Sequence, residues 1–218
     1  MIVFALEGNQ MDTAPQAARK GRKYDDVLAG AREVFLTQGF DGASVDDIAR
    51  KAGVSKATLY SYFPDKRLMF LEVIRVECNL QLQGAESKIS PQVKLKDALR
   101  IAAVTLVDVY TSDFYVRMYR LVVAESERFP ELGRQFYETG PLQGRYRMVR
   151  YLIEAEERGA IKIEDKLLAA DFFAEMCRAD MFTKMLLGIA AKPTQAEKDR
   201  VINGAVAMFL ARYCPENC

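Results

Sequence analysis

The sequence predicts an all-α protein, and three observations support this. Apolar residues recur at helical spacing from about residue 25 to residue 213. Glycine and proline breakers fall between these periodic runs. No alternating apolar and polar pattern, as expected for a half-buried strand, lasts for more than a few residues. We therefore expect three short N-terminal helices followed by a larger helical part.

The first three helices each have recognisable start or stop signals. The first carries an apolar face from Val27 to Phe35 and ends near Gly39, which suits a C-terminal cap. Ser44 suits the N-cap of a second helix that ends at Gly53. The third is capped by Ser55, carries Leu59, Tyr62 and Phe63 on its inner side and stops before Pro64. The second and third helices are only about two turns long.

The helices after Pro64 are longer and less sharply bounded. A fourth helix starts after Asp65 and runs past Val76. Breakers are expected at Ser90-Pro91, Pro130, Gly140-Pro141, Gly159 and Pro193. The remaining periodic runs are 93–110, 114–127, 131–157, 166–187 and 194–213. We accordingly predict an N-terminal arm over 1–23, a three-helix domain over 24–67 and a larger helical domain over 68–218.

Composition narrows the class of protein. Half of the 218 residues are apolar and 28% are charged, which is typical of a soluble globular chain. No apolar run approaches the length of a membrane span, and the short apolar start at 1–6 has no basic flank like that of a signal peptide. We expect a cytoplasmic protein with no membrane partner.

Catalysis and metal binding are disfavoured. Histidine is absent, which removes the commonest general base and the commonest metal ligand. The four cysteines are scattered, which favours small buried side chains and a frayed tail over a disulfide or metal site. They are Cys78, Cys177, Cys214 and Cys218. We expect no enzyme, no metal and no cofactor.

Positive charge is concentrated near the N-terminus. The net charge is only +1, yet residues 19–67 hold 10 Lys and Arg against 7 Asp and Glu. Residues 68–218 hold 21 of each sign. A polyanionic partner should therefore bind near the N-terminal helices.

The second and third helices, joined by a tight turn at Gly53, have the spacing of a helix-turn-helix. On the third helix Ala57 and Ser61 face away from the apolar side, flanked by Thr58 and Tyr60. Small side chains allow a helix to enter the major groove, and Lys56 can reach a phosphate or a guanine edge. The alternatives are a partly packed Tyr60 and a merely solvated Lys56.

Residues 40–49, 52–63 and 65–66 resemble the DNA-binding domain of tetracycline-repressor-type (TetR/AcrR) transcriptional regulators. The resemblance is dense over about 22–74, roughly a quarter of the chain. It implies a helix-turn-helix domain that binds double-stranded operator DNA. The residues that it places at the DNA are Ser44, Val45, Lys56, Ala57, Thr58, Tyr60, Ser61, Tyr62 and Lys66.

The rest of the chain resembles the C-terminal domain of a broad subgroup of these regulators less sharply. The resemblance implies a ligand pocket and a homodimer formed by the last two long helices. Aromatic and methionine side chains at helical spacing are candidates for the pocket, although they could be ordinary core. These candidates are Tyr110, Phe114, Tyr115, Met118, Tyr119, Phe172, Phe173 and Met176. Arg117 and Arg120 could anchor an anionic effector, but we favour a solvated position for both.

The widened apolar face of the last helix is the candidate dimer interface, with ordinary core packing as the alternative. Its residues are Val201, Ile202, Ala205, Val206, Met208, Phe209, Leu210 and Tyr213. The leading hypothesis is a repressor that binds a palindromic operator as a homodimer and is released by a largely apolar small molecule. A DNA- or partner-binding helical protein without an effector is the alternative, and a helical enzyme is less favoured.

Overall fold

The computed structural model describes residues 21–86 and 93–214, and these residues form α-helices and no strands. The N-terminal arm predicted over 1–23 lies mostly outside the described residues, and Arg22 and Lys23 begin the first helix. The helices are α1 (Arg22–Gly42), α2 (Val45–Ala52), α3 (Lys56–Tyr62), α4 (Lys66–Glu86), α5 (Leu95–Tyr110), α6 (Asp113–Glu125), α7 (Pro130–Thr139), α8 (Pro141–Glu157), α9 (Lys166–Arg178), α10 (Met181–Leu186) and α11 (Gln195–Tyr213).

The all-α prediction is confirmed, and two of the long predicted runs each form two helices. The run over 131–157 divides at Gly140, as the Gly140-Pro141 breaker indicates, and Pro141 opens α8. The run over 166–187 divides at Ala179 and Asp180, where neither glycine nor proline marks the break. Asp180 has φ +65°, a conformation that few residues other than glycine adopt. None of the helices in 21–86 and 93–214 is long and apolar enough to cross a membrane.

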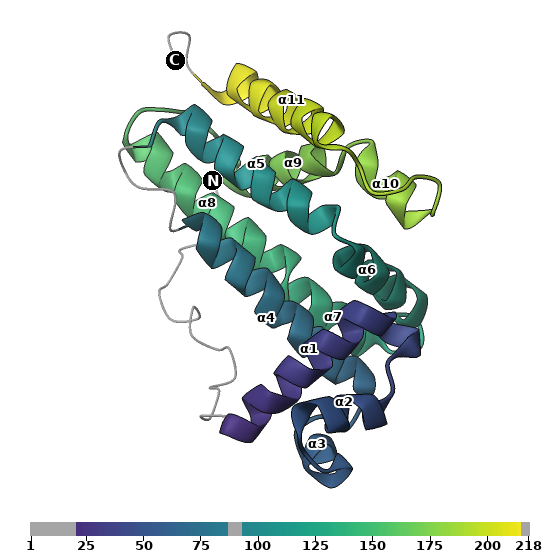
Figure 1. The fold of residues 1–218 in the computed structure, drawn as a ribbon. Coiled ribbons are helices and arrows are strands. Elements are labelled where there is room, and N and C mark those ends of the chain that lie inside the picture. Colours follow the sequence, from purple (N-terminus) through teal and green to yellow (C-terminus); the bar gives the residue numbers. More distant parts are fainter. Residues whose placement is uncertain (1–20, 87–92, 215–218) are drawn as a thin grey trace.

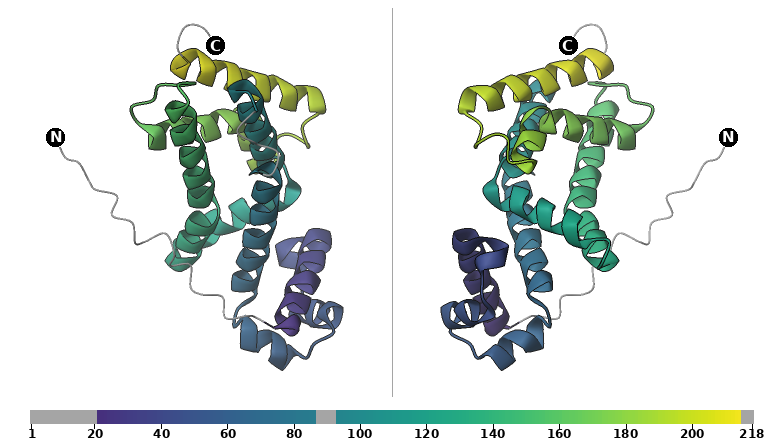
Figure 2. Two further views of the ribbon diagram at one scale, coloured as in Figure 1. Left: turned by 90° about the vertical axis from the view of Figure 1, so that its left-hand side faces the viewer. Right: turned by 90° about the vertical axis from the view of Figure 1, so that its right-hand side faces the viewer.

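Helices α1–α3 lie at one end of the molecule and α11 lies at the other, with α4 leading from the N-terminal helices into the body (Figure 1). Two further views show the same separation (Figure 2). Helix α11 packs against α5 and α9, and α8 packs against α7 and α9. The body therefore has its own helical packing, remote from α3.

One hydrophobic core begins in α1–α3 and continues into the body through α4. Val27, Ile48 and Leu59 are fully buried in it, as are Met69 of α4 and Met118 of α6. Buried residues of α7 and α10 belong to the same core. The predicted boundary at residue 67 falls inside this core, so α4 packs with both parts.

A second core lies among α5, α8, α9 and α11. Leu99, Leu152 and Phe173 are fully buried there, and the Phe173 ring meets the Phe209 ring edge-on at 5.2 Å between centroids. Tyr110, at the end of α5, packs against both cores. The two cores are therefore in contact at the end of α5.

Gly39 divides α1 near its end. Its φ and ψ are +72° and −176°, a region that is essentially restricted to glycine. A Cβ placed there would lie 2.7 Å from Nη1 of Arg117 in α6. The Arg117 side chain is flexible at this end, so the backbone conformation is the main reason for glycine at position 39.

Gly39→Ala is expected to lower the free energy of unfolding by about 1–3 kcal/mol, the cost of a strained backbone conformation. Gly42→Ala is the matched control, because its added Cβ meets only the Gln38 side chain, at 3.5 Å. Denaturant unfolding of the two variants should show a loss for the first and little change for the second. Equal stabilities would contradict this account of the kink.

Candidate DNA-binding surface and ligand cavity

The helix-turn-helix is built by local hydrogen bonds. The Ser44 hydroxyl accepts from the backbone N–H of Asp47 at 3.0 Å and so caps α2. Gly53 ends α2 with φ +65°, and its N–H donates to the carbonyl of Arg50. Ser55 then caps α3 by accepting from the backbone N–H of Thr58 at 3.1 Å. The caps predicted at Ser44, Gly53 and Ser55 are confirmed. Gly39, predicted as the end of the first helix, instead kinks α1, which runs on to Gly42.

Burial on one side fixes the orientation of α3. Leu59 is fully buried and Phe63, just after the helix, is nearly so. The Tyr24 ring of α1 stacks on Phe63 at 5.4 Å and meets Tyr62 edge-on at 5.6 Å. The Tyr24 hydroxyl donates to Glu72 of α4, and burial raises the pKa of this tyrosine. Tyr24 of α1, which is hydrogen-bonded to α4, therefore packs against the buried side of α3.

The opposite side of α3 is open to solvent. Ala57, Tyr60 and Ser61 are exposed there, and Thr58 is half-buried. Tyr62, predicted on the inner side, packs on Tyr24 but is still 36% exposed. The Ser61 hydroxyl donates to the Thr58 carbonyl at 2.6 Å. Of the predicted DNA residues outside α3, Ser44 is exposed and Val45 packs partly against the first core. The small and hydroxyl-bearing stripe predicted from the sequence is exposed to solvent.

Lys56 and Lys66 lie in different environments. Lys56 is exposed and forms an ion pair with the exposed Asp46 of α2. Lys66 is half-buried, and its ammonium donates to the carbonyls of Phe40 at 2.9 Å and Ala43 at 3.0 Å. Two of its three N–H donors are therefore used inside the protein. The end of α1 supplies the carbonyls that need these donors, and the placement of Lys66 at the DNA stays a prediction.

Lys66→Ala is expected to destabilise the N-terminal helices, because it leaves two backbone carbonyls without their donor. Each lost bond to a charged donor is worth about 1.5–3 kcal/mol. Lys56→Ala, which removes an exposed ion pair, is expected to change stability by less than about 1 kcal/mol. Thermal unfolding of both variants tests this. A larger loss for the Lys56 variant would refute the assignment.

Arg67 joins the DNA-binding helices to the body. It forms an ion pair with Asp65, and hydrogen bonds from Arg67 lower the pKa of that carboxyl group. Its guanidinium carbon lies 3.6 Å from the centre of the Phe129 ring, and Nη1 lies 3.8 Å from the carboxylate of Glu125 in α6. Arg67 thus bridges α4 and the end of α6.

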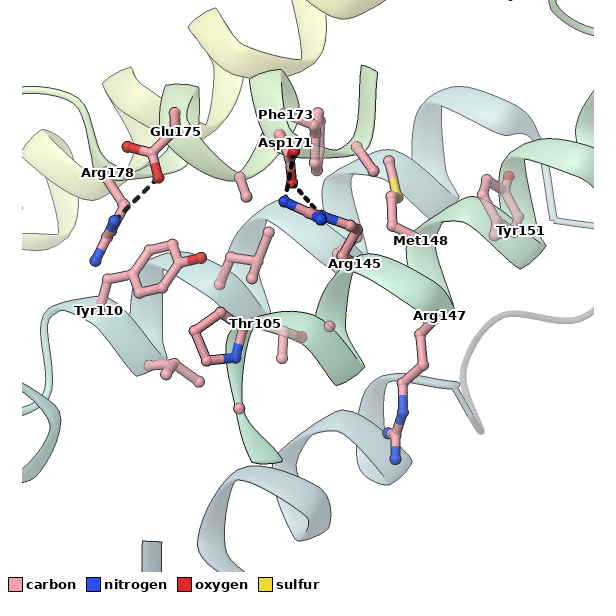
Figure 3. A pocket seen from close by; sticks show the side chains of 18 of the residues that line it. Thr105, Tyr110, Arg145, Arg147, Met148, Tyr151, Asp171, Phe173, Glu175 and Arg178 are labelled. Carbon is pink, nitrogen blue, oxygen red and sulfur yellow. Dashed lines mark hydrogen bonds and ion pairs between the residues drawn. The ribbon is translucent and has the colours of Figure 1, made fainter. Parts of the chain in front are cut away.

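A cavity of about 710 Å³ lies in the body, lined by residues of α5, α6, α7, α8 and α9 (Figure 3). This volume suits a drug-sized ligand. Most of the wall is apolar, with tyrosine hydroxyls and a few charged groups. Burial raises the pKa of Tyr110 and of Tyr151. The pKa of the Cys177 thiol, behind this wall in α9, is raised by burial to about 12.

Four of the eight predicted pocket residues line this cavity: Tyr110, Tyr115, Tyr119 and Phe173. The other four lie elsewhere. Met118 is fully buried in the first core, and the Phe114 ring packs against Phe70 at 5.5 Å. Met176 packs against the second core, and Phe172 is 51% exposed. These four point away because each sits on a different side of its helix from the cavity.

Charged residues in the wall were missed from the sequence. Arg145 of α8 donates to both carboxylate oxygens of Asp171 in α9, at 2.7 and 2.8 Å. Glu175 and Arg178 follow Asp171 at helical spacing on the same wall. In sequence this charged stripe looks like a solvated helix face, so no local signal identifies it.

Arg117 and Arg120 lie outside the cavity, and Arg120 donates to the carbonyls of Leu186 and Met185.

The residues predicted for the dimer interface are mostly covered by their own chain. Five of them are buried in the second core, which α11 forms with α5, α8 and α9: Val201, Ile202, Ala205, Val206 and Phe209. Tyr213 is half-buried, with its ring 4.9 Å from that of Phe209. Met208 is 64% exposed. The stated alternative, ordinary core packing, therefore describes these five residues, since their apolar side faces the core of the same chain.

A different side of α11 is exposed, and it carries mainly small residues. Gly204, Ala207, Met208 and Ala211 lie along it at helical spacing. Helix α9, which packs against α11, also leaves apolar side chains exposed, namely Leu167, Leu168 and Phe172. Large exposed apolar side chains gathered on neighbouring helices are typical of interaction surfaces.

The exposed helix-turn-helix and the helical body with a ligand-sized cavity define a DNA-binding transcriptional regulator. Residues 27–73 match the family described as "Bacterial regulatory proteins, tetR family". Residues 97–215, more than half of the chain, match "AefR-like transcriptional repressor, C-terminal domain". The protein belongs to the TetR family of transcriptional regulators.

Individual relatives agree with this assignment. The transcriptional activator FasR of Mycolicibacterium smegmatis is 30% identical over 115 residues, which are 53% of this chain and 48% of FasR. The chain thus matches about half the length of this curated relative. A TetR-family regulator from Mesorhizobium loti has a TM-score of 0.79 at 29% identity, covering 90% of this chain and 99% of that chain. The flavonoid-responsive regulator FrrA has a TM-score of 0.66 at 34% identity, with the same coverage.

Proposed function

We propose that the protein is a homodimeric repressor that binds a palindromic operator and is released when a small molecule occupies the cavity. The main observation behind this proposal is that part of the cavity wall belongs to the same hydrophobic core as the DNA-binding helices. Tyr115 and Phe136 are buried members of that core and also line the cavity. A ligand that shifts α6 therefore acts directly on the packing of α1 and α4.

Further contacts connect the cavity to the DNA-binding helices, so that a change at the cavity can alter the position of these helices. Helix α6 carries Tyr115 and Tyr119 on its cavity side and Arg117 on the side that approaches Gly39 of α1. Arg67 also connects α4 to the end of α6. An effector that prefers the arrangement unable to bind DNA weakens operator binding by the same factor by which DNA weakens effector binding.

The exposed side of α11 and the apolar residues of α9 supply the proposed dimer surface. Its members are Leu168, Phe172, Gly204, Ala207, Met208 and Ala211. Small residues on α11 allow a partner helix to approach closely, and a two-fold axis would place two copies of α3 on successive major grooves. The cytoplasm is the expected location, since the proposed target is chromosomal DNA.

The effector is proposed to be a small aromatic molecule. Tyr110, Tyr115, Tyr119 and Phe136 contribute rings to the wall, and aromatic rings stack well on one another. The description of the 34% identical FrrA as flavonoid-responsive points to the same class of ligand.

Operator binding tests the proposal. Duplexes selected from a random library by the full-length protein should contain an inverted repeat, and the logarithm of the affinity should fall linearly with the logarithm of the salt concentration. Aromatic compounds that bind the protein should release the selected duplex. Absence of binding to any duplex, or binding of a single asymmetric half-site by a monomer, would overturn the proposal.

A further inference from the structure

Arg178, the last residue of α9, is held in the cavity wall by aromatic rings. Its guanidinium carbon lies 5.0 Å from the centre of the Tyr110 ring, 5.2 Å from Tyr119 and 4.4 Å from Phe182. Its side chain is only 19% exposed. Figure 3 shows the Arg178 side chain beside Tyr110, with Glu175 on the same helix. Attraction between the cation and the rings stabilises the charge in this position.

Most of the hydrogen-bonding capacity of Arg178 is unused by the described part of the chain. A guanidinium has five N–H donors. Nη1 donates to the Glu175 carboxylate at 2.9 Å, whereas the buried Nε has no hydrogen-bond partner. The Glu175 side chain is 66% exposed, so water screens this ion pair strongly. Arg178 is therefore a fixed, partly desolvated cation with donors still to be satisfied.

Other arginines in the same wall are engaged with the protein. Arg145 uses Nε and Nη2 for the carboxylate of Asp171. Arg147 donates to the side chain of Asn79 in α4. Arg145 supplies a natural comparison for Arg178, because both line the cavity but only Arg145 is held by two hydrogen bonds to a carboxylate.

We propose that the cavity binds an aromatic carboxylic acid whose carboxylate pairs with Arg178. A planar carboxylate can accept hydrogen bonds from the terminal nitrogens at the tip of the guanidinium, since Nη2 has no partner in the described part of the chain. The aromatic body of the ligand lies against the half-buried apolar lining residues Leu106, Val109 and Met148. This inference rests on the proposed role of the cavity as the effector site, and it adds the charge of the ligand and the residue that recognises it.

Biphenyl-4-carboxylate and its neutral analogue biphenyl-4-carboxamide are suitable probes, because they differ only in the group that faces Arg178. Calorimetric titration of the full-length protein should show about 10- to 100-fold tighter binding of the carboxylate, as expected for hydrogen bonds between charged groups. Arg178→Gln should remove this preference while leaving the affinity for the carboxamide unchanged.

Three further variants separate recognition from folding. Arg178→Lys keeps the charge but not the fork, so it should retain part of the preference. Glu175→Gln removes the competing carboxylate from an exposed position and should tighten binding of the carboxylate probe. Arg212→Gln removes the same amount of positive charge from an exposed position of α11 outside the cavity and should leave the carboxylate preference in place.

Equal affinity of the natural protein for the two probes would overturn the inference. So would a retained preference in Arg178→Gln, or failure of both probes to bind at millimolar concentration. Operator binding is measured separately, without a probe. If the carboxamide alone binds and releases operator DNA, the carboxylate assignment fails and the proposed function stands. If the carboxylate preference holds but no duplex is bound, the inference stands and the proposed function fails.

Discussion

Ala57→Leu is expected to abolish the preference for operator over random DNA while leaving non-specific binding intact. Ala57 is exposed on α3, at the middle of the stripe that faces the groove in the proposed complex. A leucine there would hold the helix away from the base edges, whereas phosphate contacts outside the groove would persist. Because specific binding commonly exceeds non-specific binding by about 10³-fold or more, the expected loss is large.

Tyr60→Phe provides the contrast. Tyr60 is 48% exposed on the flank of the stripe, where its hydroxyl can donate to a phosphate. Loss of that hydrogen bond should weaken operator and random DNA by similar factors, worth about 0.5–3 kcal/mol. Binding of both variants to operator and scrambled duplexes at one salt concentration measures the ratio. If Ala57→Leu leaves the ratio unchanged, α3 does not enter the groove through this face.

Glutamate substitutions at two adjacent positions of α11 should affect different properties, namely the folding of the protomer at one position and dimer formation at the other. Phe209 is 1% exposed and packs on Phe173, so Phe209→Glu would bury a charge in the core and cost about 4 kcal/mol or more. Met208 is 64% exposed, so Met208→Glu should leave the protomer folded. In the proposed dimer it would place a charge in the interface and separate the subunits.

Circular dichroism and sedimentation distinguish these outcomes. The Phe209 variant should lose helical signal or unfold at much lower temperature. The Met208 variant should keep the helical spectrum, sediment as a monomer and bind operator weakly. A natural protein that is already monomeric at micromolar concentration would refute the dimer, and a dimeric Met208 variant would move the interface to another surface.

The DNA-binding helices could be predicted closely because their signals are local. Ser44 and Ser55 cap helices within three residues of themselves, and Gly53 adopts the positive φ that the turn requires. The exposed and buried sides of α3 also follow from helical periodicity. The engagement of Lys66 could not be predicted, because its acceptors at Phe40 and Ala43 lie more than twenty residues away.

The body was less predictable because its features depend on which helices meet. Periodicity identifies an apolar side on α11 but does not say whether its own chain or a partner covers it, and Phe209 is covered by its own chain. The break at Asp180 lacks glycine or proline, and the aspartate is held by Lys184 and Arg200. The role of Arg178 depends on rings from three other helices.

The continuous core through α4 limits how freely DNA specificity can be exchanged between regulators of this architecture. A chimera joined at residue 67 would replace one side of an interface whose other side is formed by Met118 and Val122 of α6 and by Phe136 of α7. Mismatched side chains there would create voids or clashes. DNA-binding helices moved from one regulator to another should therefore function only when the facing residues of α6 and α7 are exchanged together with them. The smallest part that can be exchanged is then α1–α4 plus these facing residues.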